Sequence, residues 1–182
     1  MTDVEIANVI GWITYQQEFD LAAFAETFSR REEIVEVTYK PEQNHWLQTH
    51  FAPDDTYVAF YRSGRCSITG VKSIAEFQSI VNRINAVMKD ILCFNYEPES
   101  RITNIVATAE LESAVPLEVF AVELGMDSVE YEPEQFPALI YRKQDYVMMI
   151  FSSGNMICTG LNDLDDVVNA VEEVRQRAQS LT

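Results

Sequence analysis

The chain has 182 residues, of which 47% are hydrophobic, so its composition predicts a globular protein and excludes a disordered one. Its 13 basic and 29 acidic residues give a net charge of −16, which argues against the basic patch of most nucleic-acid-binding proteins. The longest apolar runs, such as residues 146–151, are too short to cross a membrane, and the N-terminus lacks a signal-peptide pattern, so we expect a cytoplasmic protein.

The negative charge is unevenly distributed. Residues 1–91 carry 8 basic and 13 acidic side chains, whereas residues 92–182 carry 5 and 16. Two interpretations stay open: an acidic surface adapted to a salty cytoplasm, or an acidic face that docks a basic partner. Three scattered cysteines, Cys66, Cys93 and Cys158, form no Cys-x-x-Cys pair, so we expect reduced thiols in the core.

In the first half, apolar residues at helical spacing predict two helices separated by strands. The first helix presents Leu21, Phe24, Ala25 and Phe28 on one stripe. Strands are expected over 34–39, 57–61 and 65–71. Ser73 and Glu76 form a capping-box pattern that predicts the start of a second helix, whose core stripe is Ile74, Phe77, Val81 and Ile84.

The second half shows the same order of elements. Pro116 and Gly125 bracket a helix whose stripe is Leu117, Phe120, Ala121 and Leu124. Strands are expected over 129–131, 139–142, 146–151 and 155–161. Asp163 predicts the start of a last helix, whose stripe is Leu164, Val167, Val171 and Val174.

Short similar segments recur in the same order in both halves. The matches are 131–135 with 39–43, Ser153-Gly154 with Ser63-Gly64, Thr159-Gly160 with Thr69-Gly70, and Asn104 with Asn8. A repeat of about 90 residues is too long for a solenoid unit. We therefore expect two homologous repeats, 1–92 and 93–182, in one intimately joined pseudo-twofold domain, which suits a nearly twofold ligand such as duplex DNA.

Consecutive strands joined by tight turns predict an antiparallel sheet. Two helices per half can cover only one of its faces. Side chains alternate along a strand, so the other face of the second half is expected to carry Asn104, Val106, Val147, Met149, Phe151, Ile157 and Thr159. An exposed apolar surface with a few polar groups marks an interaction site.

Residues 129–142, Val-Glu-Tyr-Glu-Pro-Glu-Gln-Phe-Pro-Ala-Leu-Ile-Tyr-Arg, resemble the signature of the archaeal and eukaryotic TATA-binding protein family. The segments 104–106, 150–154 and 158–160 add to a resemblance that covers nearly the whole chain. It implies an α+β fold: a pseudo-twofold saddle with a curved, ten-stranded antiparallel sheet. The resemblance also implies four helices on the convex face and DNA under the concave face.

The resemblance implies binding in the minor groove, where an A·T pair shows only acceptors and a G·C pair adds an amino donor. Asn and Thr side chains can donate to those acceptors, and Phe136 and Phe151 match the family's wedge pair. The implied DNA-binding residues are Asn8, Ile10, Tyr61, Arg62, Arg65, Thr69, Asn104, Val106, Phe136, Arg142, Met149, Phe151, Ile157 and Thr159. Lys143 is a further expected phosphate contact.

The family's partner is transcription factor B, which the loop carrying Glu132, Glu134 and Gln135 is expected to bind; a merely solvated loop is the alternative. No enzyme, cofactor or metal site is expected. His45 and His50 lie on an expected loop with no third ligand at metal spacing. Further expectations are a nucleoid-associated location in the cytoplasm, no membrane contact, and a weak homodimer when the protein is free.

The first half departs from the family pattern at several open-face positions. The first-half position that matches Phe136 is Asn44, the one that matches Phe151 is Tyr61, and the one that matches Thr108 is Trp12. Ala59 and Ser67 replace Met149 and Ile157. Two hypotheses follow for a divergent paralogue with an eroded first repeat. One is a promoter-binding initiation factor with altered sequence preference, favoured by Arg62 and Arg65. The other is an interaction module with weakened DNA binding, which engages factor B as adaptor or competitor and is favoured by Asn44 and Trp12.

Overall fold

The computed structural model describes residues 3–180, and the chain divides into two compact units. The first unit is residues 8–103, and the second is the described part of residues 1–7 and 104–182. The limits of these units differ from those of the repeats expected from the sequence, 1–92 and 93–182. Residues 1–2 and 181–182 of the expected repeats lie outside the part of the chain that the structure describes. The hydrogen-bonded strand order is β2-β3-β4-β5-β1-β6-β10-β9-β8-β7.

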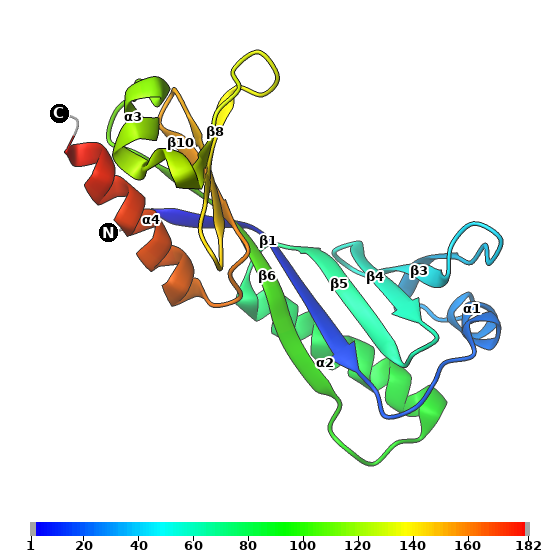
Figure 1. Cartoon of the computed structure of the whole chain (residues 1–182). Helices are drawn as coiled ribbons and strands as arrows, with labels where there is room; N and C mark the ends of the chain where they lie inside the picture. The colour runs from blue at the N-terminus through cyan, green and yellow to red at the C-terminus, as the bar shows by residue number, and fades with distance from the viewer. Residues whose placement is uncertain (1–2, 181–182) are drawn as a thin grey trace. The chain divides into compact units, whose positions relative to one another are not determined.

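The early elements belong to the first unit, except that residues 4–7 of the first strand belong to the second. They are β1 (Val4–Thr14), α1 (Leu21–Phe28), β2 (Ile34–Thr38), β3 (Trp46–Phe51), β4 (Thr56–Tyr61), β5 (Arg65–Val71) and α2 (Ile74–Leu92). Strands β2 to β5 form an antiparallel meander, and β5 pairs with β1. Figure 1 shows α2 lying along one side of β1 and β5.

The second unit repeats this arrangement after β6 (Glu99–Glu110). Its elements are α3 (Leu117–Leu124), the short 3-10 helix η1 (Met126–Ser128), β7 (Val129–Glu130), β8 (Ala138–Arg142), β9 (Val147–Phe151), β10 (Asn155–Thr159) and α4 (Leu164–Gln179). The antiparallel strands run β6-β10-β9-β8-β7. Helix α3 packs on β8 and α4 on β10.

The helix ends follow the capping signals in the sequence. Ser73 accepts a hydrogen bond from the backbone N–H of Glu76, whose carboxylate accepts one from the N–H of Lys72. Asp20 and Asp163 accept from N–H groups in the first turns of α1 and α4. These side chains satisfy donors that a helix start leaves without partners.

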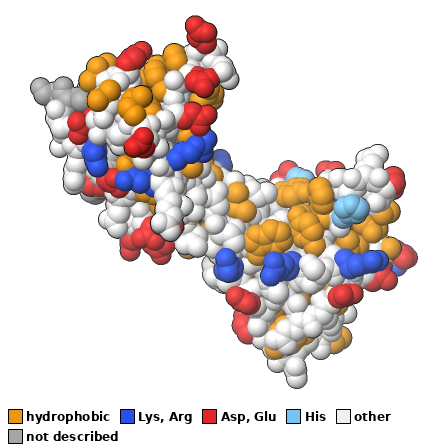
Figure 2. Space-filling model, viewed as in Figure 1, with side chains coloured by type: hydrophobic (Ala, Val, Ile, Leu, Met, Phe, Trp, Pro, Cys, Tyr) orange, Lys and Arg blue, Asp and Glu red, His pale blue; other side chains and the backbone are white. Residues whose placement is uncertain are grey.

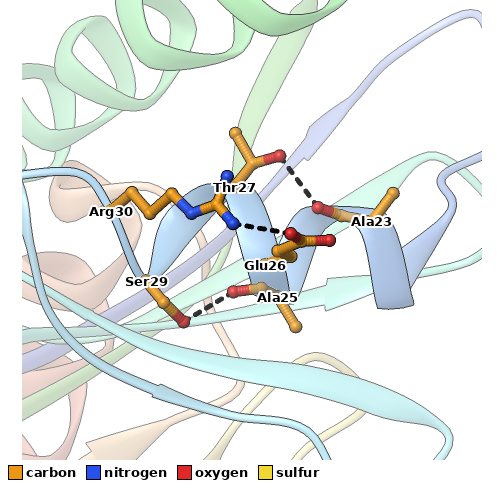
Figure 3. A network of polar contacts seen from close by, with 6 residues as sticks. All are labelled: Ala23, Ala25, Glu26, Thr27, Ser29 and Arg30. Atoms are coloured by element: carbon orange, nitrogen blue, oxygen red, sulfur yellow. Dashed lines mark hydrogen bonds and ion pairs between the residues drawn. The ribbon is translucent and has the colours of Figure 1, made fainter.

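Polar side chains also complete the end of the short helix α1. Thr27 Oγ1 donates to the carbonyl of Ala23 over 2.9 Å, and Ser29 Oγ donates to that of Ala25 over 2.7 Å (Figure 3). Arg30 pairs with Glu26 on the exposed side. The Ser29 hydroxyl thus adds a second hydrogen bond to the Ala25 carbonyl, which also accepts from the Ser29 backbone N–H at the helix end.

The core of each unit lies between its helices and one face of its sheet. In the first unit, Phe24, Phe28 and Phe60 form an aromatic cluster beside Leu47. In the second unit, Tyr141 is buried with the other helix-facing side chains, Leu139, Met148, Ile150, Met156 and Cys158. The helical stripes predicted from the sequence supply most of the opposing surface.

The fold class expected from the sequence is confirmed: an α+β fold with ten antiparallel strands and, among the described residues, four α-helices. Three local predictions were wrong. His50 lies in strand β3, not in a loop. Cys93 is exposed because it ends α2 with φ 52°, and Ile74, in the first turn of α2, is 40% exposed. Within residues 3–180, no helix is long and apolar enough to cross a membrane.

Candidate nucleic-acid interface

Each unit has a sheet face whose side chains remain partly exposed, and we call it the open face. In β6, Ile105 and Ala107 are buried, whereas Asn104, Val106 and Thr108 are partly exposed. The same alternation leaves Val147, Met149, Phe151, Ile157 and Thr159 partly exposed in β9 and β10. The structure therefore brings together the second-half residues that the sequence placed on one surface.

An asparagine and a threonine form a polar clamp on the open face of the second unit. Asn104 Nδ2 donates to Thr159 Oγ1 over 3.1 Å, and the backbone N–H of Gly160 donates to Asn104 Oδ1 over 2.7 Å. Because that N–H orients the amide oxygen, the second Nδ2 hydrogen remains available. The Thr159 hydroxyl accepts from this amide and also lies 3.2 Å from Asn104 Oδ1, to which it donates.

The first unit contains the same clamp. Asn8 Nδ2 donates to Thr69 Oγ1 over 3.2 Å, and the N–H of Gly70 donates to Asn8 Oδ1 over 2.8 Å. Ile10, the next open-face residue of β1, is partly exposed. Each unit thus presents an asparagine amide beside a threonine hydroxyl in matching geometry.

Side chains that pair across neighbouring strands form what we call the middle row of each open face. In the second unit the middle row is Thr108, Ile157, Met149 and Ile140. In the first unit it is Trp12, Ser67, Ala59 and Gln48. The two rows have the same strand register and different chemistry.

Aromatic side chains flank the middle row in both units. Phe136 is 41% exposed, and its ring centroid lies 6.3 Å from that of Phe151, edge to face. In the first unit, Tyr61 lies 5.4 Å from Trp12 and 6.1 Å from Trp46, centroid to centroid. Both tryptophans therefore contact Tyr61.

The position of Trp46 shows how the first unit keeps an aromatic pair although Asn44 replaces Phe136. Trp46 pairs with Tyr61 across β3 and β4, as Ala138 pairs with Phe151 in the second unit. The large aromatic ring of the first unit therefore lies two residues after the position that matches Phe136. Trp46 is visible in the sequence, but its pairing with Tyr61 follows only from the strand register.

The positive charges differ in availability between the two units. Arg142 pairs with Glu130 over 3.0 Å, and Lys143 pairs with Glu173 over 3.2 Å, in the second unit. In the first unit, Arg62, Arg65 and Arg101 are exposed and form no ion pair with any described residue. The first unit carries 9 basic and 13 acidic residues, and the second carries 4 and 16.

Figure 2 shows where positive charges of the first unit lie. Hydrophobic side chains gather over the strands that Figure 1 labels β4 and β5, and Lys and Arg side chains line one margin of the patch. An apolar surface bordered by cations suits a ligand with a flat apolar interior and anionic edges.

The Lys143 ion pair belongs to a polar cluster at the end of β8. Tyr141 and Tyr146 both donate hydrogen bonds to the Glu173 carboxylate, over 3.3 and 3.0 Å. Hydrogen bonds with Tyr141 and Glu173 raise the pKa of Lys143. Burial opposes ionisation of Glu173, but hydrogen bonds from Lys143 and the tyrosines outweigh it, so the pKa of that carboxyl is lowered. Lys143 is therefore positively charged, and its ammonium group is already paired with Glu173.

A cleft of about 1090 Å³ lies beside the open face of the second unit. Thr108, Phe151 and Ile157 contribute to its wall, together with the acidic residues Asp3, Glu5, Glu110, Glu112 and Glu172. Negative charge therefore lies next to the apolar residues of this face, and it repels phosphate unless salt screens it.

The loop between β7 and β8 has an ordered backbone turn. The N–H groups of Gln135 and Phe136 donate to the Glu132 carbonyl over 2.9 and 3.0 Å, and the Gln135 amide hydrogen-bonds the Glu132 carboxylate. Glu132, Glu134 and Gln135 are all exposed. The first unit has the same turn, with the N–H of Gln43 donating to the Lys40 carbonyl.

Comparisons with known proteins agree with this architecture. The family model described as "Transcription factor TFIID (or TATA-binding protein, TBP)" matches residues 3–91 and 99–181. A TATA-box-binding protein of Archaeoglobus fulgidus is 33% identical, with 98% of this chain and 96% of the relative covered. "TATA-box-binding protein 2" of Haloferax volcanii is also 33% identical, with 98% and 94% covered.

A solved structure of Methanococcus jannaschii TBP matches with a TM-score of 0.81 and 32% identity, covering 97% of this chain and 98% of that one. These matches define the class of the protein: a two-repeat transcription factor, not an enzyme. The chain belongs to the TATA-binding protein family.

Proposed function

We propose that this protein is a general transcription initiation factor that binds A·T-rich promoter DNA through the minor groove. The observation that carries the proposal is the pair of clamps, Asn8 with Thr69 and Asn104 with Thr159. Each clamp offers an amide donor beside a threonine hydroxyl on an open face, and A·T pairs present only acceptors in the minor groove. The relatives named TATA-box-binding protein support the same ligand.

The apolar residues of the second unit supply the rest of the contact. Val106, Met149 and Ile157 are partly exposed and offer no partner for a guanine amino group. We assign Phe136 and Phe151 as the wedges that enter base steps, which the exposure of Phe136 and its ring contact with Phe151 support. Unstacking costs about a few kcal/mol per step in minor-groove proteins of this kind, and the contact area of bent DNA offsets it.

Phosphate contacts are assigned mainly to the first unit. Arg62 and Arg65 are exposed without an ion partner among the described residues, whereas Arg142 is held by Glu130. With a net charge of −16, the protein depends on screening to approach DNA. Binding that relies on shape and deformability is less sensitive to this repulsion than binding by phosphate pairing alone.

We assign the exposed loop with Glu132, Glu134 and Gln135 to transcription factor B. Its carboxylates are accessible, and its backbone turn holds the side chains in a defined arrangement. The substitution Glu134→Arg is expected to abolish recruitment of factor B while binary DNA binding persists. Equal loss of both activities would instead indicate a damaged fold.

A second candidate function is an interaction module that engages factor B with weakened DNA binding. The specific observation in its favour is the cluster of Trp12 and Trp46 on Tyr61, which partly occupies the open face of the first unit. In that case the protein would act as an adaptor or a competitor.

Fluorescence anisotropy with A·T-rich and G·C-rich duplexes, at several salt concentrations and with or without factor B, separates the two functions. An initiation factor binds the A·T-rich duplex more tightly in at least one condition. Equal binding to both duplexes under every condition, with factor B still bound, would refute the promoter function and favour the interaction module.

A further inference from the structure

We propose that the open face of the first unit accepts a guanine amino group, so that this protein tolerates a G·C pair in the half of its site that this unit contacts. The inference rests on the proposed minor-groove function and deepens it. It assigns Ser67 and Gln48 as residues that determine sequence specificity.

The side chains of the two middle rows differ in size. Ser67 stands where the second unit has Ile157, and Ala59 stands where it has Met149. Branched and long apolar side chains pack against the floor of the groove and leave a guanine amino group without space or partner. Ser67 removes that bulk at a partly exposed position, whereas Ala59 is 1% exposed and contributes no accessible surface.

The two middle rows also differ in hydrogen-bonding chemistry. Ser67 and Gln48 are partly exposed, and their side chains make no hydrogen bond to any described residue. Serine Oγ and glutamine Oε1 both accept hydrogen bonds. The guanine amino group is the one donor that base pairs present in the minor groove. Polar atoms without protein partners thus face the region where that donor would lie.

Trp12 is the residue most able to block this contact, and its position leaves Ser67 accessible. The Trp12 ring lies against Tyr61, which pairs with Arg65 and not with Ser67. The ring therefore leans along β5 toward Arg65, and Ser67 remains partly exposed. The indole N–H has no partner among the described residues, so it can donate to a pyrimidine O2 or purine N3.

The second unit supplies an internal contrast. Its middle row presents Ile157, Met149 and Ile140, none of which can accept a hydrogen bond. The two units of one chain should therefore respond in opposite ways to the same amino group. A·T pairs should be favoured by the second unit, and G·C pairs should be tolerated by the first.

The test replaces one base pair at a time in an A·T-rich duplex with G·C or inosine·C. Fluorescence anisotropy then measures the binding of the full chain to each duplex. Inosine·C lacks only the amino group of G·C. We expect G·C to bind about fivefold more tightly than inosine·C at one or more positions in one half-site, as for one added hydrogen bond. In the other half-site the amino group should weaken binding.

Two substitutions assign the effect to the residues. Ser67→Ile should remove the advantage of G·C, and the reciprocal Ile157→Ser should reduce the penalty in the other half-site. Thermal unfolding confirms that each variant is folded. An amino group that weakens binding at every position, or discrimination that Ser67→Ile leaves unchanged, would overturn the inference. Failure of the wild-type protein to bind the parent duplex would refute the proposed function itself.

Discussion

At the scale of single residues, ion pairing decides which positive charges can reach a phosphate. Arg142 lies in the segment that resembles the family signature, and its guanidinium pairs with Glu130 over 3.0 Å. Arg62 and Arg65 depart from that pattern and are unpaired among the described residues. The sequence showed all four residues, but only the paired strands β7 and β8 reveal which arginine is neutralised.

Releasing Arg142 should therefore strengthen DNA binding. Glu130→Gln removes a surface ion pair worth at most about 1 kcal/mol, so we expect affinity to rise about two- to fivefold. The slope of log affinity against log salt should steepen by about one, as for one added phosphate contact.

The matched control for Glu130→Gln is Glu26→Gln, which frees Arg30 on the surface of α1. It changes the net charge by the same amount away from the open faces. If both variants strengthen binding equally in anisotropy titrations, general charge reduction explains the gain and Arg142 has no specific role.

Glu173 gives a second prediction at this scale, because its carboxyl pKa is lowered by Lys143 and two tyrosines. A group with a lowered folded-state pKa stabilises above its unfolded pKa, and this stabilisation is lost as the pH falls through the folded-state value. Glu173 is 40% exposed, so solvent screening keeps the contribution small.

Glu173→Gln should lower the melting temperature by about 2 °C at pH 7 and by less at pH 3. Glu172→Gln on the same helix is the control, since Glu172 makes no ion pair with a described residue. Melting curves followed by circular dichroism measure both. A deficit that is as large at pH 3 as at pH 7 would contradict the assigned electrostatic cause.

At the scale of elements, the two clamps depend on glycines in unusual backbone conformations. Gly70 and Gly160 have φ values of 87° and 111°. A Cβ at position 160 would lie 2.8 Å from the Asp145 carbonyl oxygen, whereas one at position 70 would meet nothing within 4 Å. Both positions have a backbone conformation that is strained for residues other than glycine, but only position 70 has room for a Cβ.

Gly160→Ala should therefore cost more stability than Gly70→Ala. Both substitutions carry the penalty of a left-handed conformation, but only the first also forces backbone to move. We expect its melting temperature to fall about 2–4 °C further, which corresponds to about 1 kcal/mol. Equal losses in both variants would mean that the contact with Asp145 relaxes freely.

The sequence predicted most helices and strands, because their apolar spacing and capping residues are local signals. It failed for β3, where Gln48 and His50 face the open side and the buried side includes the polar Thr49. Thr49 is tolerated there because its hydroxyl donates to the Val58 carbonyl over 2.8 Å. A polar residue at a buried position hides the apolar alternation of a strand in the sequence. The hydrogen bond that satisfies it becomes evident only when the neighbouring strand is known.

At the scale of the whole molecule, the duplication was the most informative signal. It matches Asn8 with Asn104 and Thr69 with Thr159 between the repeats, and within each repeat the asparagine and the threonine form a clamp. The aromatic contacts of the first unit could not be predicted, since Trp12, Trp46 and Tyr61 come from three strands. Their contacts depend on register and ring orientation, which composition and spacing do not specify.

The central claim is that the open faces bind the minor groove and that Phe136 and Phe151 open base steps. The most direct measurement is fluorescence resonance energy transfer between dyes on the two ends of an A·T-rich duplex. We predict that the wild-type protein shortens the end-to-end distance and that Phe136→Ala and Phe151→Ala each reduce both the shortening and the affinity. Saturating binding without any shortening, or full shortening by both variants, would contradict the account.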